Sequence, residues 1–264
     1  MKQVALISTI VMVIALYCAV TGIQDSVAAH AKNDQEERSP FVSAYLWDGS
    51  VAYEEDAQTG EGLPVSAYPY GAANDHLGED WMLVLVNAHN PLPDGFTPSL
   101  ATLPNGLEFD ARAVGELERM LADARQQGLA PLVCSAYRDY GFQQTLFGAE
   151  VARYRGQGLS LEEASTVARK SVAYPGTSEH HLGLAADIVP ADHQVLDEAQ
   201  SQTPLYAWLV AHCADYGFIL RYPANKTGVT GIMFEPWHYR YVGYEAAQAI
   251  MRSGLCLEEY LGAA

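Results

Sequence analysis

Two histidine-containing motifs in this sequence combine the residue types that hold a catalytic metal. The first contains His180 and, seven residues later, Asp187; the second contains Glu235 and, three residues later, His238. Two imidazoles and one carboxylate leave one position of a tetrahedral zinc site open for water, as a hydrolytic centre requires. Glu235 is then a carboxylate beside the metal that could accept the proton of the attacking water. The spacing therefore predicts a metal-dependent hydrolase.

These residues also have ordinary structural interpretations. A single histidine near an aspartate is more often a surface or core residue than a ligand, and Glu-x-x-His occurs by chance in many chains. His181 follows His180 directly and competes with it for the role of ligand on spacing alone. Gly183 and Ala185 lie between the first two candidate ligands, where larger side chains would block a close turn back toward the metal. The case for a metal site depends on a third motif.

The third motif contains Arg138, which comes shortly after an apolar run that predicts a strand. An arginine at the end of a strand offers a fixed pair of donors to a carbonyl oxygen that gains charge, or to a substrate carboxylate. The alternative is an ordinary arginine that pairs with Asp139 or with a helix end. Arg138 is therefore a candidate catalytic residue with two possible roles and a structural alternative.

Together the three motifs resemble those of the zinc-dependent D-alanyl-D-alanine carboxypeptidases, a family that includes the vancomycin-resistance carboxypeptidases and the L,D-carboxypeptidases of cell-wall recycling. The resemblance covers about residues 81–250, with smaller similarities at 86–93 and 217–223, and does not extend to residues 24–80. Three motifs in the family's order make it highly specific. The matching positions are Ser135, Tyr137, Arg138 and Gln143, then Ser178, His180, Gly183, Ala185 and Asp187, then Glu235, Trp237, His238 and Arg240.

The resemblance implies a fold, a cofactor and a set of roles. The fold would be α+β, with a small, mainly antiparallel sheet packed with helices, as in the zinc peptidase fold shared with the signalling domain of hedgehog proteins. Glu235 would be the general base and Arg138 the stabiliser of the oxyanion. The substrate would be the stem peptide of peptidoglycan, which would lose its terminal D-alanine. One zinc ion per chain would be bound by His180, Asp187 and His238, and the substrate by Ser178, Gln143, Ser135 and Tyr137.

Other functions compete with a D-alanyl-D-alanine carboxypeptidase. An L,D-carboxypeptidase or a peptidoglycan endopeptidase of the same fold would use the same residues, and only substrate data separate them. A non-catalytic cell-wall binding module of this fold would be expected to lose Glu235 or a ligand, and all four residues are present. A serine-type D,D-peptidase needs a Ser-x-x-Lys motif, and none of the four lysines has a serine at that spacing.

The elements that must position these residues are short and mixed in type. Helices and strands alternate without a regular β-α-β order, so the sequence predicts an α+β domain with a mainly antiparallel sheet. Apolar runs predict strands at 81–86, 131–134, 185–189, 218–220 and 237–240. Capping patterns predict helices from Asp110 to Gln127, from Asp139 to about Arg155, from Ser160 onward, from Thr203 to Tyr216 and from Tyr244 to Ser253.

Composition and charge limit the partners and divide the chain. Of 264 residues, 49% are hydrophobic and 18% are charged, which is typical of a chain that buries a core. The net charge of −17 would repel phosphate backbones, so we expect no nucleic-acid partner. Residues 24–80 hold 12 acidic and 2 basic side chains, which marks a boundary near residue 80.

Three regions are expected. Residues 1–23 combine a positive start with a long uncharged apolar run and are expected to be a signal peptide or a membrane anchor. Residues 24–80 would be an acidic extracytoplasmic spacer with a hairpin at 45–53, and 81–264 the zinc carboxypeptidase domain. The protein is thus expected outside the membrane at the bacterial cell wall, as a monomer, with the membrane a partner if the N-terminal segment is retained.

Three cysteines follow the N-terminal segment, namely Cys134, Cys213 and Cys256. An odd number leaves at least one thiol unpaired in an extracellular domain. Cys134 ends an apolar strand and is expected to be a buried thiol. A disulfide between Cys213 and Cys256 is an alternative that the sequence leaves open, because both lie in late helical segments.

Overall fold

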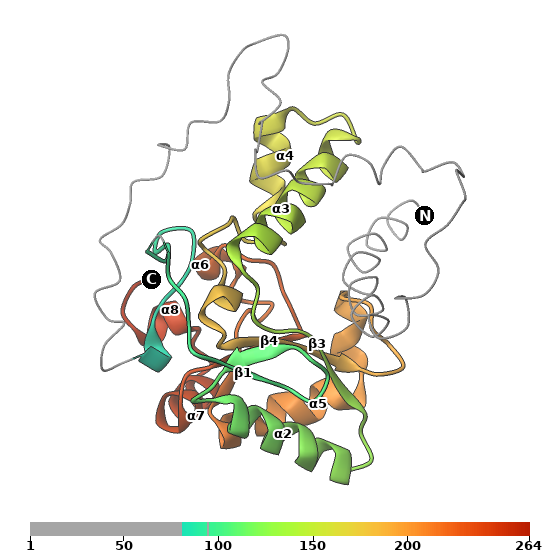
Figure 1. Ribbon diagram of the computed structural model, residues 1–264, viewed down its shortest axis with the longest axis vertical. Coiled ribbons are helices and arrows are strands. Elements are labelled where there is room, and N and C mark those ends of the chain that lie inside the picture. The colour runs from blue at the N-terminus through green and yellow to red at the C-terminus, as the bar shows by residue number, and fades with distance from the viewer. Residues whose placement is uncertain (1–80, 94) are drawn as a thin grey trace, which may run out of the picture.

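The computed structural model of the protein describes residues 81–93 and 95–264 (Figure 1). The expectations for the segment 1–23, the spacer 24–80 and the hairpin at 45–53 lie outside the described residues. Within the described range, no helix combines the length and the apolar composition that crossing a bilayer requires.

A four-stranded sheet, in which every neighbouring pair of strands is antiparallel, forms the centre of the fold. A separate two-stranded sheet lies beside it. The combination of small antiparallel sheets with helices confirms the predicted α+β class. The large sheet has the order β3 (Pro131–Ser135), β4 (Ala185–Pro190), β6 (His238–Tyr241) and β5 (Phe218–Leu220), and the small sheet pairs β1 (Leu100–Thr102) with β2 (Glu108–Asp110).

One face of the large sheet is apolar, because side chains alternate between the two faces along each strand. Ala186, Ile188 and Tyr239 all belong to the largest buried core cluster. Helices α2 (Val114–Gln126) and α5 (Pro204–His212) contribute to the same cluster and lie along this side of the sheet (Figure 1). This packing fixes which side chains of β4 and β6 face away from the core helices.

The opposite face carries polar side chains. Ala185 pairs with Arg240 and Asp187 pairs with His238 across β4 and β6. The three polar members of these pairs are buried. Burying charged groups is costly unless they are paired or bind a metal, so this face of the sheet is where a functional site is expected.

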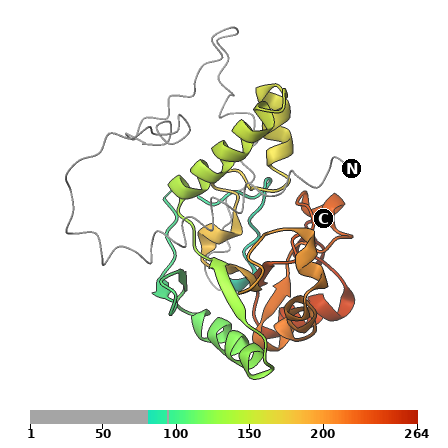
Figure 2. The same ribbon diagram turned by 90° about the vertical axis from the view of Figure 1, so that its right-hand side faces the viewer.

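Helices α3 (Tyr140–Arg155) and α4 (Leu161–Ala168) pack against each other and extend away from the sheet (Figures 1 and 2). Asp139 caps α3 by accepting the backbone N–H of its third residue over 2.7 Å. Ser160 and Glu163 form the predicted capping box at the start of α4. Local sequence signals therefore determine where both helices begin.

The remaining helical elements connect or follow the strands, and all but α7 are five residues or shorter. Of these, η4 carries one of the candidate metal ligands, and α8 follows the last long helix. They are η3 (Trp81–Leu83), η4 (Glu179–Leu182), η5 (Glu198–Gln202), η6 (Cys213–Tyr216), α6 (Thr227–Thr230), α7 (Tyr244–Ser253) and α8 (Leu257–Tyr260).

The strand predicted at 81–86 is wrong. Its first residues form the 3-10 helix η3, and the rest is an irregular segment with buried side chains. The carbonyl groups of Met82 and Val84 accept hydrogen bonds from Arg240 Nη2, over 3.0 and 2.9 Å. A side chain from another part of the chain thus replaces the strand partner that an apolar run would predict.

Two helix boundaries also differ from the prediction. Asp110 does not cap α2: it ends β2, and its carboxylate lies 2.6 Å from Nη2 of Arg112. The hairpin of β1 and β2 was not predicted, and it delays the helix start to Val114. The helix predicted to reach Tyr216 ends as α5 at His212 and tightens into the 3-10 helix η6.

The three cysteines within the described residues are all buried. Cys134 is a buried thiol, as predicted, and its Sγ donates to the carbonyl oxygen of Asp187 over 3.4 Å. The alternative of a disulfide is wrong for this structure, since Cys213 and Cys256 are both thiols. Burial raises the pKa of Cys213 to about 12.

Candidate metal centre

His180 is presented by the 3-10 helix η4, directly before β4. The Ser178 hydroxyl caps η4 by accepting the backbone N–H of His180 over 3.4 Å. Gly183 ends η4 with a φ of 70°, and a Cβ at this position would lie 3.2 Å from the backbone nitrogen of Asp110. Glycine is therefore required for the chain to turn from η4 straight into the strand that carries Asp187.

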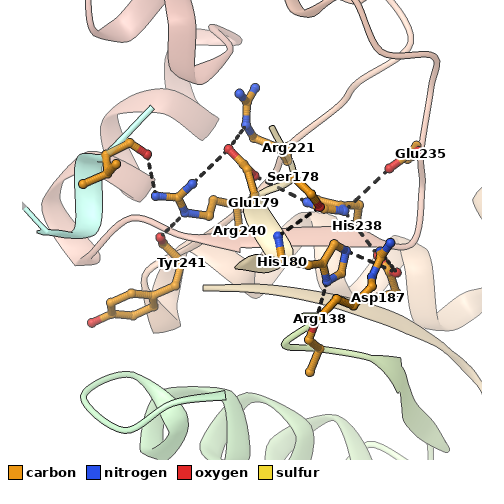
Figure 3. A network of polar contacts seen from close by, with 12 residues as sticks. Arg138, Ser178, Glu179, His180, Asp187, Arg221, Glu235, His238, Arg240 and Tyr241 are labelled. Atoms are coloured by element: carbon orange, nitrogen blue, oxygen red, sulfur yellow. Dashed lines mark hydrogen bonds and ion pairs between the residues drawn. The ribbon is translucent and has the colours of Figure 1, made fainter. Parts of the chain in front are cut away.

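Asp187 and His238 are brought together by the register of the sheet, because they are directly opposite each other on β4 and β6. Oδ1 of Asp187 lies 3.2 Å from Nδ1 of His238, and Oδ2 lies 3.4 Å from Nε2 of His180. One ligand atom from each residue lies within 4.8 Å of the others (Figure 3). Burial would raise the pKa of Asp187, but the two histidines hold it well below its usual range.

These donors fit a zinc ion in type, and His180 also has the protonation state that a ligand needs. Nδ1 of His180 donates to the carbonyl oxygen of Ala136 over 2.6 Å, which leaves the lone pair of Nε2 for a metal. Within the described residues, Nε2 of His180 and Oδ1 of Asp187 are buried without a hydrogen-bond partner, a cost that a metal ion would relieve. Burial, with the charge of Arg138 adding to it, lowers the pKa of His180 to about 4, so this ligand is neutral.

His238 lies between three carboxylates. Its Nδ1 faces Asp187 at 3.2 Å and Glu235 at 3.6 Å, and its Nε2 faces Oε2 of Glu179 at 3.4 Å. Burial would lower the pKa of His238, but the neighbouring carboxylates of Asp187 and Glu179 raise it to about 9. The negative charge that surrounds Nδ1 is what a bound cation would neutralise.

Glu235 lies just before β6, beside the cluster but not among the three converging ligand atoms. Its backbone N–H donates to the carbonyl oxygen of Tyr222 over 3.1 Å, which holds the loop in place. Burial raises the pKa of Glu235 to about 8, although the charge of His238 opposes the rise. A carboxyl group with a pKa near the working pH is suited to proton transfer, which supports its candidacy as general base.

Arg138 is held by three side chains on the same face as the cluster. Its Nε donates to Ser135 Oγ over 3.0 Å and its Nη1 to Gln143 Oε1 over 3.0 Å. Its Nη2 lies 3.3 Å from Oδ2 of Asp187, the same oxygen that faces His180. Asp139 caps α3 instead of pairing with this guanidinium. The arginine therefore lies beside the metal cluster in a fixed orientation.

The four predicted substrate-binding residues lie in different environments. Ser135 and Gln143 both contact Arg138, and Gln143 is fully buried. Ser178 is also buried, and its hydroxyl caps η4. Tyr137, by contrast, lines a cavity of about 370 Å³. The geometry gives the first three residues partners within the chain and places Tyr137 at an open surface.

His181 is distinguished from His180 by the contacts of its ring. Nδ1 of His181 donates to the carbonyl oxygen of Arg138 over 2.7 Å, and Nε2 accepts the backbone N–H of Gly176 over 3.1 Å. Both ring nitrogens are thus engaged in the protein. His181 supports the loop that carries the arginine, and the structure brings His180 alone of this pair to the cluster.

Glu179 is a residue of the site that the sequence reasoning missed. It is fully buried, and its carboxylate lies between Arg221, Arg240 and His238 (Figure 3). Burial would raise the pKa of Glu179, but the two arginines hold it well below its usual range. Its signals in the sequence are its position next to a ligand and the arginines in the segments 217–223 and 235–240.

The fold and the cluster together are those of a small α+β zinc peptidase. The family model described as VanY: D-alanyl-D-alanine carboxypeptidase matches residues 106–244, which is more than half of the chain, and the protein belongs to this family. A D-alanyl-D-alanine carboxypeptidase of Enterococcus faecalis (strain ATCC 700802 / V583) is 44% identical over 184 residues. The match covers 69% of this chain and 66% of that protein, so the chain spans about two thirds of its relative.

Solved structures show the same fold. A variant of the vancomycin resistance D,D-pentapeptidase VanY, from a VanB-type resistance cassette and in complex with Zn(II), has a TM-score of 0.63 and 44% identity. That comparison covers 69% of this chain and 99% of the other. The LdcB LD-carboxypeptidase has a TM-score of 0.60 and 34% identity, over 68% of this chain and 85% of the other.

Proposed function

We propose that the protein is a zinc metallocarboxypeptidase that removes the C-terminal D-alanine from peptidoglycan stem peptides. The observation that carries the proposal is the convergence of His180, Asp187 and His238, with the carboxylate of Glu235 3.6 Å from the ring of His238. The relative named a D-alanyl-D-alanine carboxypeptidase supports the substrate class, and the VanY structure with Zn(II) supports the metal. The higher identity to VanY than to LdcB favours D,D- over L,D-specificity.

Each residue has a distinct part in the reaction. Zinc, when bound, supplies Lewis acidity and a more acidic water. Glu235 accepts a proton from the water whose oxygen bonds to the scissile carbonyl carbon, and it delivers a proton to the amine nitrogen when the C–N bond breaks. Arg138, already oriented by three side chains, donates to the carbonyl oxygen as negative charge develops there.

The substrate is assigned to the surface beside Arg138. Ser178 and Gln143 are proposed to hold the C-terminal end of the peptide, with Ser135 and Tyr137 as further contacts. The cavity lined by Tyr137 offers room for a peptide, whereas the contacts of Ser135 and Gln143 indicate that they also act through the orientation of the arginine. We expect the functional unit to be a monomer.

The remaining regions define where the reaction takes place. Residues 1–23 are proposed to be a signal peptide or a membrane anchor, and 24–80 an acidic spacer that lets the domain at 81–264 reach the wall. Because stem peptides lie outside the cytoplasmic membrane, the domain is proposed to act there. Zinc and the stem peptide are then its two partners, with the membrane as a third if the N-terminal segment is retained.

Defined stem peptides test the function. The full chain is incubated with a pentapeptide that ends in D-Ala-D-Ala and with a tetrapeptide whose last D-alanine follows an L-centre. Mass analysis should show the pentapeptide losing one alanine, no loss after chelation, and recovery when zinc is restored. A pentapeptide with a terminal L-alanine is the control for stereochemistry.

Each other outcome corrects a different part of the proposal. Release of alanine by enzyme that contains no metal would exclude the metal mechanism. Cleavage of the tetrapeptide alone would identify an L,D-carboxypeptidase. Cleavage within a longer cross-linked peptide, without release of a terminal residue, would identify an endopeptidase.

A further inference from the structure

A buried ionic network runs from the metal cluster to the C-terminal helix α8. Its four members are Glu179, Arg221, Arg240 and Glu258. Oε1 of Glu179 lies 2.7 Å from Nε of Arg221 and 2.9 Å from Nη1 of Arg240 (Figure 3). Arg221 then forms two hydrogen bonds with Glu258 of α8, from Nη1 over 2.8 Å and from Nη2 over 2.6 Å. Two carboxylates and two guanidinium groups make the set neutral as a whole.

The burial of this ionic network is nearly complete. The side chains of Arg221, Arg240 and Glu179 are 0% exposed, and that of Glu258 is 3% exposed. Removing one member of a buried ionic set is costly, because it leaves a partner charge without compensation. Burial of this kind is weak evidence for added stability, so the presence of the ionic network needs another explanation.

The two oxygens of Glu179 face different partners. Both arginines contact Oε1, whereas Oε2 lies 3.4 Å from Nε2 of His238. A hydrogen bond from Nε2 leaves Nδ1 with its lone pair, and Nδ1 is the nitrogen that faces Asp187 and Glu235. A carboxylate on the far nitrogen of a ligating histidine fixes its tautomer and orientation and raises its basicity as a ligand.

Hydrogen-bond partners of this ionic network lie on both sides of the segment 106–244 that matches the family model. Before it, the carbonyl groups of Met82 and Val84 accept from Arg240. After it, α8 provides Glu258, whose Oε1 also accepts from Nδ2 of Asn87 over 3.3 Å. The segments on either side of the family match thus provide hydrogen-bond partners for the ionic network that reaches His238.

We propose that Glu179 is a positioning residue for His238 and that Glu258 of α8 supports it through Arg221. The proposal rests on the proposed function, since it concerns the orientation of a zinc ligand. It assigns to the C-terminal helix a role in metal retention. Both glutamates are buried and paired with Arg221, so the proposal gives them an effect through His238 and not through contact with the substrate.

Zinc affinity of full-length variants tests the proposal. Zinc dissociation constants are measured by competition with a chromophoric chelator for the parent, Glu179→Gln and Glu258→Gln. We expect Glu179→Gln to bind zinc about 10–100-fold more weakly, the range found when a hydrogen-bond partner of a metal ligand is replaced. Glu258→Gln should weaken binding in the same direction by a smaller factor, because it acts one residue further away.

Two control variants separate positioning from general loss of stability. Glu259→Gln changes the neighbouring carboxylate, which contacts Lys226 and the backbone of Cys256 but is not a member of the ionic network. Ser160→Ala removes the capping box of α4 and lowers stability away from the cluster. Both controls should keep the zinc affinity of the parent. The visible spectrum of the cobalt(II) form should change in Glu179→Gln and not in the controls.

The outcomes are distinguishable. Parental zinc affinity and an unchanged cobalt spectrum in folded Glu179→Gln would overturn the positioning role while leaving the proposed function intact. If Glu179→Gln does not fold, the comparison of Glu258→Gln with Glu259→Gln decides, and equal affinities would overturn the proposal. Failure of the parent to bind zinc would instead refute the proposed function.

Discussion

Replacement of Arg138 by alanine is the perturbation whose result the structure defines most closely. The guanidinium makes three side-chain contacts, at 3.0 Å to Ser135, 3.0 Å to Gln143 and 3.3 Å to Asp187. Its side chain is only 12% exposed, so its orientation is fixed before a substrate arrives. A donor fixed in this way stabilises developing charge without reorganisation, so its loss should be felt in the transition state.

The expected magnitude follows from the number of contacts. Removal of one preorganised donor to an oxyanion lowers kcat by about 10²–10³-fold, and we expect that loss for Arg138→Ala. Ser135→Ala removes only one of the three contacts that orient the guanidinium. A hydrogen bond to a charged group contributes about 1.5–3 kcal/mol, and about 1.4 kcal/mol corresponds to tenfold in rate, so loss of this one contact should cost at most about 10–100-fold, less than the loss of the arginine itself. Arg138→Lys should recover little, because a point charge does not reproduce the planar fork.

Steady-state kinetics with the D-Ala-D-Ala pentapeptide measure both parameters for the parent and the three variants. Zinc content must be equal in all samples, because Arg138 also contacts Asp187. A lower kcat with a similar KM supports a role in the transition state. A change confined to KM would show that Arg138 binds the terminal carboxylate instead. Parental kcat and KM in zinc-loaded Arg138→Ala would refute the reasoning altogether.

Three further predictions concern other residues. Glu235→Gln should keep zinc and lower kcat by about 10²–10⁴-fold, as measured by metal analysis and kinetics; near-parental turnover would reassign the base. His180→Ala should lose stoichiometric zinc whereas His181→Ala should retain it, because both ring nitrogens of His181 contact the protein. Cys213 should resist alkylation at pH 8 in the native state: its pKa is raised to about 12, so the reactive thiolate forms only as the pH approaches that value. Rapid native labelling of this thiol, followed by mass spectrometry, would contradict its burial.

The sequence alone determines much of this protein through local signals. The cap at Asp139 and the capping box at Ser160 start α3 and α4 where predicted, because these hydrogen bonds form within one turn of chain. The spacing of small residues between His180 and Asp187 predicts a tight turn, and Gly183 makes it with a positive φ. Residue types in the motifs were also sufficient to identify the candidate ligands before their distances were known.

Only the tertiary structure decided which groups face one another. The two adjacent histidines are equivalent in spacing, and only the family resemblance favours His180; contacts with Ala136 and Arg138 from distant segments give the physical reason why their roles differ. The one local signal of Glu179 is its position next to His180; its partners Arg221 and Arg240 come from segments far along the chain, so its role could not be predicted locally. Hydropathy likewise predicts a strand at 81–86, yet a buried arginine takes the carbonyl groups that a strand partner would use. Hydrogen bonds and charge compensation between distant segments depend on the packed core, and no local window of sequence contains them.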